Sequence, residues 1–267
     1  MFLHYLKIAF RNMWIYRTQN IISVVGLAVG FVCFAFSALW IRYEMSYDNF
    51  HPKADRIYRV NTKFFKWDTA GSSSAEIIQD GTAYPLANWL KSNFPEIEEA
   101  CAILTRNPEP LKLLYLDRNF CKIFDMNLSE NFFVEGQTDK LIAVLPEFNN
   151  KTTAESIKKL FNWDVRMTAM PRWPANTNIK FNTAIPITTR FSEHDLNNWN
   201  FNWFDTYILI KNGADVKALE KKLDKVVVPE WTPPISIVLT PLKQLRYKDP
   251  TGNIQSEIKF APDFDGF

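Results

Sequence analysis

Residues that commonly catalyse reactions or bind metals are few in this sequence. It has three histidines and three cysteines, and no HExxH, CxxC or His-x-His spacing that would predict a metal site. The run Glu193-His194-Asp195 places an imidazole between two carboxylates, but neighbouring side chains on a strand or turn point in different directions. We interpret this run as a solvated loop and expect no metal on this chain.

A serine and a lysine have the spacing of one class of nucleophilic enzymes. Ser156 and Lys159 match the S-x-x-K of penicillin-binding enzymes, but the companion motifs S-D-N and K-T-G do not occur. The phosphate-binding pattern G-x-x-x-x-G-K-[ST] does not occur either. We therefore expect no catalytic and no cofactor-binding residue here. A membrane-anchored hydrolase that uses Ser156 and Lys159, or His194, is the third-ranked hypothesis.

The composition limits the class of partner. The net charge of +2 predicts no global basic field of the kind that attracts nucleic acid, so no nucleic-acid partner is expected. Four tryptophans of the second half would suit either a platform for sugar or peptide or an ordinary aromatic core, and we favour the core. They are Trp163, Trp173, Trp199 and Trp203.

Two cysteines beyond the first forty residues allow two interpretations. Cys101 and Cys121 would form one disulfide in an oxidising compartment, or they would be two buried thiols. Both interpretations stay open at this point.

A long apolar segment near the N-terminus would anchor the rest of the chain to a membrane. Residues 21–41, IISVVGLAVGFVCFAFSALWI, carry no acidic or basic residue. As a helix this run is about 31 Å long, close to the hydrocarbon thickness of a bilayer. The basic region before it is too long for a cleavable signal peptide, and no A-x-A site follows. We predict a retained transmembrane helix over residues 21–42.

Small side chains recur in this segment at spacings of three and four residues, so they share one stripe of the helix. They are Ser23, Gly26, Gly30, Cys33 and Ser37. Such a stripe lets a second helix approach closely, although a GxxxG such as Gly26 and Gly30 is common in membrane spans. Because five small residues are in register, we predict a helix-packing face.

The first twenty residues are basic and lack acids. We predict a cytoplasmic amphipathic helix over residues 1–20 that contacts the membrane surface through Lys7, Arg11, Trp14 and Arg17. Glu44 and Asp48 follow the span, so the positive-inside rule places the N-terminus in the cytoplasm and the rest of the chain outside it.

The exported part alternates between strand and helix patterns. Strands are predicted at 58–64, 100–104, 207–211 and 235–239, and helices at 86–94, 152–161 and 216–226. The predicted fold class is α+β. A split β-α-β, ferredoxin-like subdomain would occupy residues 50–105 and 203–247. A second subdomain would be inserted at residues 106–200.

Several segments resemble ABC-transporter permeases of the FtsX/MacB type. They are YLKIAFRNMW at 5–14, the glycine-bearing span, EMSYDNFH-x-x-ADRIYRV at 44–60, and weaker matches at 86–103, 116–128, 205–223 and 241–247. The most specific part is residues 42–60. The resemblance implies a MacB-like periplasmic core domain over residues 43–267, in a bacterial inner-membrane protein.

The resemblance also implies a mechanism without catalysis on this chain. ATP would be bound by a cytoplasmic ABC ATPase, and the exported domain would relay the resulting motion to a substrate or to a periplasmic or outer-membrane partner. Other permease helices, or a second copy of this chain, would pack on the span. The junction after the span would be the lever. Its predicted residues are Tyr47, Asp48, Phe50, His51, Asp55 and Arg56.

One feature departs from that family. Its members have further membrane helices after the core domain, whereas residues 253–267 are not apolar enough to span a bilayer. A truncated chain, a split gene and a single-pass relative all fit this observation. The alternative function is therefore a single-pass, membrane-anchored binding or interaction module without transport activity.

Overall fold

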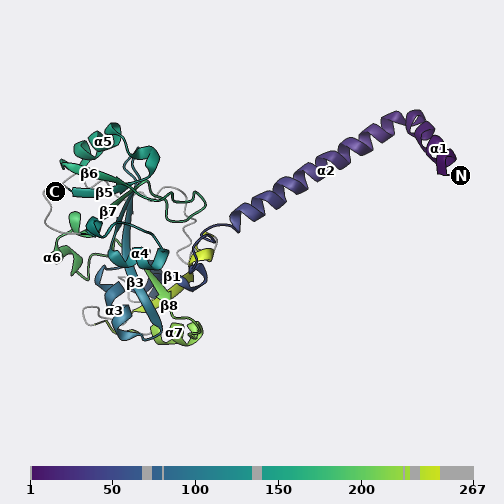
Figure 1. The fold of residues 1–267 in the computed structure, drawn as a ribbon. Helices are drawn as coiled ribbons and strands as arrows, with labels where there is room; N and C mark the ends of the chain where they lie inside the picture. Colours follow the sequence, from purple (N-terminus) through teal and green to yellow (C-terminus); the bar gives the residue numbers. More distant parts are fainter. Residues whose placement is uncertain are drawn as a thin grey trace. The chain divides into compact units, whose positions relative to one another are not determined.

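The computed structural model describes residues 2–67, 74–79, 81–133, 140–224, 226–228 and 235–246 (Figure 1). The chain divides into two compact units, residues 1–46 and residues 47–267, which are described separately. The segment 253–267 considered above lies outside the described residues.

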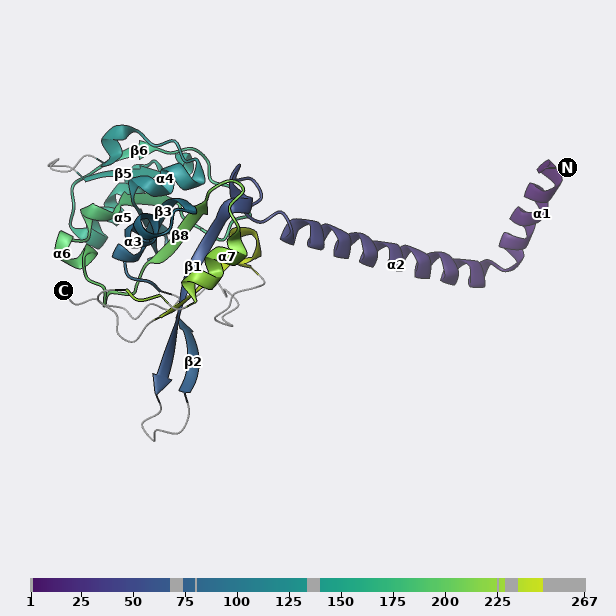
Figure 2. The same ribbon diagram turned by 90° about the horizontal axis from the view of Figure 1, so that it is seen from below.

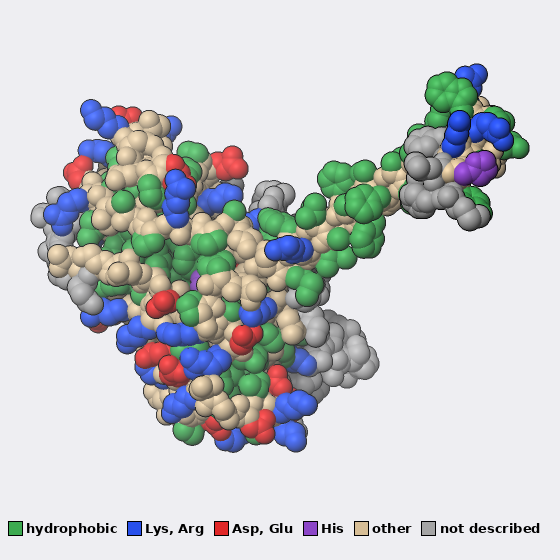
Figure 3. Space-filling model, turned by 45° about the vertical axis from the view of Figure 1, so that its right-hand side comes forward, with side chains coloured by type: hydrophobic (Ala, Val, Ile, Leu, Met, Phe, Trp, Pro, Cys, Tyr) green, Lys and Arg blue, Asp and Glu red, His purple; other side chains and the backbone are tan. Residues whose placement is uncertain are grey.

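The first unit consists of two helices, α1 (Phe2–Ile15) and α2 (Arg17–Glu44). Within the described residues, α2 alone is long and apolar enough to cross a membrane, with a mean hydropathy of 2.4 over its most apolar window. None of its residues is buried, and hydrophobic side chains cover its surface (Figure 3). The predicted helix at 21–42 is thus confirmed as a helix, and it begins and ends slightly beyond the predicted range.

The second unit is a mixed α+β domain built on a nine-stranded sheet, which confirms the predicted class. Its strands are β1 (Ile57–Trp67), β2 (Ser74–Gln79), β3 (Ile97–Arg106), β4 (Leu113–Leu116), β5 (Lys140–Val144), β6 (Val165–Ala169), β7 (Thr183–Pro186), β8 (Asp205–Ile210) and β9 (Ser236–Pro241). Its helices are α3 (Pro85–Asn93), α4 (Arg118–Phe124), α5 (Lys151–Phe161), α6 (Glu193–Leu196) and α7 (Val216–Leu223). Short 3-10 helices are η1 (Ala54–Arg56), η2 (Glu130–Phe133), η3 (Pro146–Phe148), η4 (Ile187–Thr189) and η5 (Leu242–Gln244).

One half of the sheet has the strand order β9-β1-β8-β3, with every neighbouring pair antiparallel. Helix α3 precedes β3 in the chain and α7 connects β8 to β9. Strand β2 pairs with the far end of β1, and the two strands extend away from the other strands (Figure 2). The predicted strands and helices at both ends of the domain are confirmed.

The other half continues from β3 in the order β4-β7-β5-β6. Strands β4 and β7 are parallel, as are β5 and β6, while β5 and β7 are antiparallel. In this half of the domain, helix α5 was predicted but the four strands were not. The four strands were missed because they are four or five residues long, and because β4 and β7 are buried at every position and show no polar alternation.

Side-chain caps set several helix ends. Asp117 accepts a hydrogen bond from Phe120 N (2.9 Å) at the start of α4, and Asn150 accepts one from Thr153 N (2.9 Å) at the start of α5. Helix α6 begins with a capping box between Ser192 and Asp195. Residues 193–195 therefore form a short exposed helix, and the loop predicted there was wrong because the cap supplies the missing hydrogen bonds.

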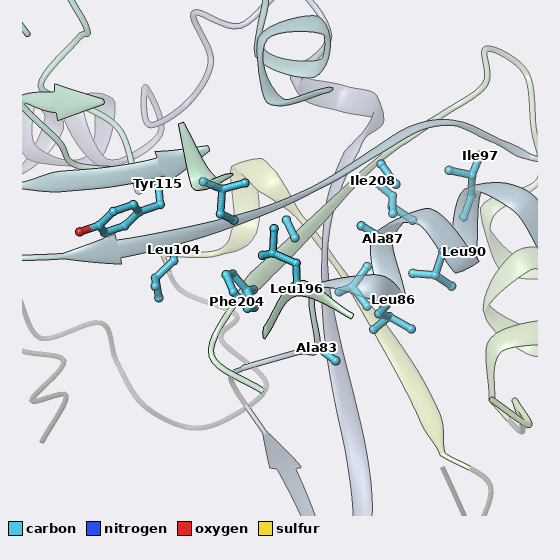
Figure 4. Close-up of a cluster of buried hydrophobic side chains, with 14 of the residues drawn as sticks. Ala83, Leu86, Ala87, Leu90, Ile97, Leu104, Tyr115, Leu196, Phe204 and Ile208 are labelled. Atoms are coloured by element: carbon cyan, nitrogen blue, oxygen red, sulfur yellow. The ribbon is translucent and has the colours of Figure 1, made fainter. Parts of the chain in front are cut away.

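Alternating strand residues enter two cores on opposite faces of the sheet. The first core contains Ala100 and Ala102 of β3 together with residues of α3, α5 and α7. Its residues Leu86, Ala87 and Leu90 of α3 are labelled in Figure 4. The second core contains Cys101 and Ile103 of β3 together with residues of α4. Both faces of β3 are therefore covered by helices.

A glycine closes the first core near the start of α3. A Cβ atom at Gly81 would lie 1.9 Å from the carbonyl oxygen of Asn202. The adjacent Thr82 and Phe204 exchange backbone hydrogen bonds of 2.7 and 3.1 Å, which hold the two segments at this distance. No side chain fits between them.

Gly81→Ala is therefore expected to destabilise the folded domain by about 1–3 kcal/mol, the usual cost of overpacking. Thermal unfolding of the full chain in detergent, followed by tryptophan fluorescence, measures this loss. The control is Gly213→Asn, at a position with φ of 78° and open space around it, where asparagine is tolerated. An unchanged unfolding temperature for Gly81→Ala would contradict the prediction.

Candidate functional site

The predicted lever residues lie in the segment through which the chain enters the second unit, residues 47–56, here called the anchor segment. Helix α2 ends at Glu44, well before Pro52, and turns follow it. The predicted lever residues therefore all lie beyond the end of α2. The anchor segment is held instead by contacts with the folded domain.

Asp48 makes the densest set of these contacts. Its side chain is fully buried. Oδ1 accepts a hydrogen bond from Thr177 Oγ1 (2.6 Å), and Oδ2 accepts from Asn178 Nδ2 (2.6 Å) and Asn178 N (3.1 Å). The backbone N–H of Asp48 donates to the Asn176 carbonyl (3.0 Å). Asp48 thus binds each residue of the loop at 176–178: its carboxylate accepts from Thr177 and Asn178, and its backbone N–H donates to Asn176.

The position of Asp48 is unfavourable without these partners. Its φ of 54° lies in the left-handed region, which L residues other than asparagine and aspartate rarely adopt. Burial raises the pKa of its carboxyl group, and the hydrogen bonds from Thr177 and Asn178 lower it again in part. The loop at 176–178 is therefore what keeps Asp48 buried in this conformation.

His51 lies in an aromatic environment. Its ring centroid is 4.0 Å from that of Phe50, 5.1 Å from Phe124 and 5.1 Å from Trp173. The side chain is 5% exposed, and Nε2 has no hydrogen-bond partner among the described residues. Burial lowers the pKa of His51 to about 4, although a hydrogen bond with the Phe124 backbone opposes this. The imidazole is consequently neutral at physiological pH.

Charged and aromatic groups hold the remaining anchor residues. The Arg246 guanidinium lies 4.0 Å from the ring centroid of Tyr47, a cation–π contact. Arg56 Nη1 contacts Glu98 Oε2 of β3 (2.6 Å) and donates to the Ile210 carbonyl of β8 (2.9 Å). The ion pair between Asp55 and Lys243 (2.7 Å) is exposed on the aspartate side and contributes little.

The sequence analysis identified the residues of the anchor segment but not the residues that bind them. The partners Trp173, Thr177, Asn178 and Arg246 were missed, because they lie more than one hundred residues away in the chain. A signal existed in the short polar residues of the run N176-T177-N178, whose side chains commonly bind carboxylates and backbone groups in loops. Nothing in the sequence pairs that loop with Asp48.

The predicted membrane-facing residues lie in the first unit. Lys7, Arg11 and Trp14 are exposed on α1, and Arg17 is exposed at the start of α2. Apart from the neighbouring residues and the backbone of α2 itself, no atom of the described residues lies within 4 Å of a Cβ placed on Gly26 or Gly30. Ser37 Oγ donates to the Cys33 carbonyl (2.8 Å), so this hydroxyl is satisfied within the helix. The small-residue stripe thus has room for another helix.

The remaining chemical candidates are not brought together. The hydroxyl of Ser156 donates to the Thr152 carbonyl of its own helix (2.9 Å), and His194 is exposed on α6. No disulfide joins Cys101 and Cys121 in the part of the chain described, where Cys101 is buried. Across the same residues, no group of three histidine, cysteine or acidic side chains could hold a metal ion.

Three of the four tryptophans pack against the cores. Trp163 and Trp199 lie against the first core and Trp173 against the second, where its Nε1 donates to the Ile179 carbonyl (2.9 Å). Trp203 remains 43% exposed. The core interpretation therefore holds for all of them except Trp203.

Removing the Asp48 carboxylate tests its structural role. Asp48→Ala leaves the donors of Thr177 and Asn178 buried without an acceptor and adds left-handed strain, so a loss of about 3–5 kcal/mol is expected. Asp48→Asn keeps an acceptor and tolerates the positive φ, so its loss should be clearly smaller. Unfolding temperatures of the full chain in detergent measure both. Equal stabilities of the two variants would contradict this assignment.

Protonation of His51 gives a pH-dependent prediction. Between pH 7 and pH 5 the unfolded histidine takes up a proton, whereas the folded one, with a pKa of about 4, does not. The wild-type chain should therefore lose about 2 kcal/mol of stability, relative to His51→Gln, over this interval. Unfolding measured at both pH values checks the difference.

His194→Gln, at an exposed position, should keep the pH profile of the wild-type chain. Burial raises the pKa of Asp117 to about 6, which acts in the opposite direction in every variant and cancels in the comparison. If the wild type and His51→Gln follow parallel pH profiles, His51 is not held neutral by burial.

Comparisons with known proteins identify solved structures with a similar fold. No protein-family model matches the sequence, and no curated protein sequence matches it. Among solved structures, a domain of a protein described as a permease from Porphyromonas gingivalis is similar with a TM-score of 0.52 and 17% identity, over 72% of this chain and 91% of that one. The periplasmic region of MacB from Actinobacillus actinomycetemcomitans matches with a TM-score of 0.36 and 12% identity, over 64% of this chain and 82% of that one. The chain therefore shares its fold with a permease domain, in agreement with the FtsX/MacB-type resemblance of its sequence.

Proposed function

We propose that this chain is a membrane subunit of an ABC-type transporter or mechanotransmission complex. Its folded domain would relay motion, driven by a cytoplasmic ATPase, to a substrate or to a periplasmic or outer-membrane partner. The observation that carries the proposal is the fold shared with the permease domain. The antiparallel order β9-β1-β8-β3, with helices α3 and α7 on one face, supports the ferredoxin-like arrangement as part of it.

The anchor segment supports a mechanical role. A moving membrane helix can displace a domain as a body only if the connection between them is tied to the domain. Asp48 is hydrogen-bonded to residues 176–178, and Arg56 contacts both β3 and β8. Displacement of the anchor segment would therefore pull on strands and on a distant loop at once.

The topology of the proposal follows from charge. Lys7, Arg11 and Arg17 precede the apolar helix α2, so the N-terminus would lie in the cytoplasm of a bacterium and residues 47–267 in the periplasm. Helix α1 would lie on the inner face of the cytoplasmic membrane. No catalytic group is assigned to this chain, and ATP would be bound by the partner ATPase.

A second candidate function is a single-pass, anchored binding module. The observation that favours it is an open depression of about 460 Å³ lined by His194, Asn197, Asn198, Trp199 and Asn200. Amide and indole groups of this kind suit a neutral polar ligand. Ligand binding that needs no ATPase would distinguish this function from the first.

Co-purification tests the first proposal. We expect the tagged full chain, extracted from the membrane at native level, to bring down an ABC ATPase and other permease helices. Gly26→Leu with Gly30→Leu should abolish this, because leucines on the small-residue stripe would keep the partner helix at a distance.

The matched control is Ala28→Leu with Ala35→Leu, which places two leucines on the opposite side of α2 and should leave the complex intact. Recovery of the wild-type chain without an ATPase would contradict the transporter proposal and favour the binding module. Loss of the ATPase in both double variants would instead show that the stripe is not the packing face.

A further inference from the structure

Arg106 and Trp203 are in contact at the end of β3, Tyr115 and Arg190 interact electrostatically with Arg106, and no role has been assigned to these residues. Arg106 is the last residue of β3, Tyr115 lies on the neighbouring β4, Arg190 follows η4, and Trp203 precedes β8. We call them the arginine cluster. Sequence reasoning considered only Trp203 of these four.

The two side chains with a direct contact are Arg106 and Trp203. The Arg106 guanidinium lies 5.4 Å from the centroid of the Trp203 ring, within the range of a cation–π interaction. The Phe201 ring, 4.1 Å from Trp203, supports the indole, and Trp203 is still 43% exposed. A guanidinium and an indole are thus held in place together at a surface that a ligand can reach.

The positive charge of the cluster is not neutralised by the described residues. Among them, neither Arg106 nor Arg190 forms an ion pair or a side-chain hydrogen bond. The half-buried Arg56 and the fully buried Arg59, by contrast, each contact a carboxylate. Burial lowers the pKa of Arg106, and the positive charge of Arg190 lowers this pKa further. An ionised Tyr115 would raise the pKa of Arg106. Two nearby cations without a counterion favour binding of an anion.

Tyr115 adds a neutral donor to the cluster. Its ring is buried in the first core, and its hydroxyl is directed away from Leu196 and Phe204 (Figure 4). Burial raises the pKa of this hydroxyl to about 12 although both arginines lower it, so the group keeps its proton. A protonated phenol close to two guanidinium groups can donate a hydrogen bond to the same anion.

We propose that the arginine cluster binds a ligand in which an oxyanion, carboxylate or phosphate, is attached to a flat ring. Guanidinium groups bind both oxyanions through paired N–H donors, and the exposed indole of Trp203 offers a surface for the ring. This site is separate from the anchor segment and does not rest on the proposed transport function.

Fluorine NMR tests this site in the full chain. The protein is labelled with 5-fluorotryptophan in an uncharged detergent, and the Trp203 signal is identified by its absence in Trp203→Phe. Benzoate, phenyl phosphate and neutral benzamide are titrated at constant ionic strength. We expect a saturable shift of the Trp203 signal with benzoate, phenyl phosphate or both, and none with benzamide. A response to only one of the anions identifies the oxyanion that the site prefers.

Arginine variants decide whether the cluster is responsible. Arg106→Met and Arg190→Met should each weaken the binding of the anion about tenfold or more, the loss typical of one charge-assisted hydrogen bond. The matched control is Arg118→Met, because Arg118 also lies over an aromatic ring, 5.6 Å from the centroid of Phe133. Its removal should leave the affinity unchanged.

Two results would overturn the proposal. The first is the absence of a saturable Trp203 shift with either anion, or an equal shift with benzamide. The second is an unchanged affinity in Arg106→Met. If Arg106→Met fails to fold, Arg106→Lys keeps the charge but loses the paired donors, and it should still bind more weakly than the wild type.

Discussion

A single continuous strand, β3, holds the two halves of the domain together. Residues Ile97–Ile103 pair with β8, and residues 104–106 pair with β4. Its small side chains Ala100, Cys101 and Ala102 are fully buried, which lets helices approach the strand on both faces. Because successive residues enter opposite cores, a shift of one position would move every side chain to the wrong face. The register of β3 is therefore strongly constrained, and both halves of the sheet depend on it.

The anchor segment depends on this sheet. Arg56 contacts Glu98 near the start of β3. The loop at residues 176–178, which binds Asp48, lies in the half of the domain that β4 joins to β3. A buried carboxylate with a raised pKa is costly alone and is retained here by three hydrogen bonds to Oδ1 and Oδ2. A buried, neutral His51 adds a second group that tolerates no charge. Together these groups specify one arrangement of the segment.

The same strand carries the anchor contact and the arginine cluster at opposite ends. Glu98 and Arg106 are eight residues apart on β3, which corresponds to about 26 Å of extended chain. A force on the anchor segment and a ligand at the cluster would thus act on one rigid element. The proposed relay of motion and the proposed ligand site would therefore share this strand.

The sequence by itself determined the elements whose patterns are local. An uncharged run predicts α2, alternation predicts β1, and apolar spacing predicts α3, α5 and α7, because each pattern reflects one face of one element. The sequence also directed attention to Asp48 and His51, which follow the apolar helix directly. The residues that contact Asp48 and His51 could not be predicted from the sequence.

Only the tertiary structure decided which distant residues meet. Thr177 and Asn178 are more than one hundred residues from Asp48, and Arg190 and Trp203 are more than eighty residues from Arg106. Strands β4 to β7 have only four or five residues each, and β4 and β7 are buried at every position, so their own residues carry too little pattern to predict them. Contacts of this kind depend on how the chain packs, since burial and hydrogen bonding are properties of the whole fold and local spacing does not encode them.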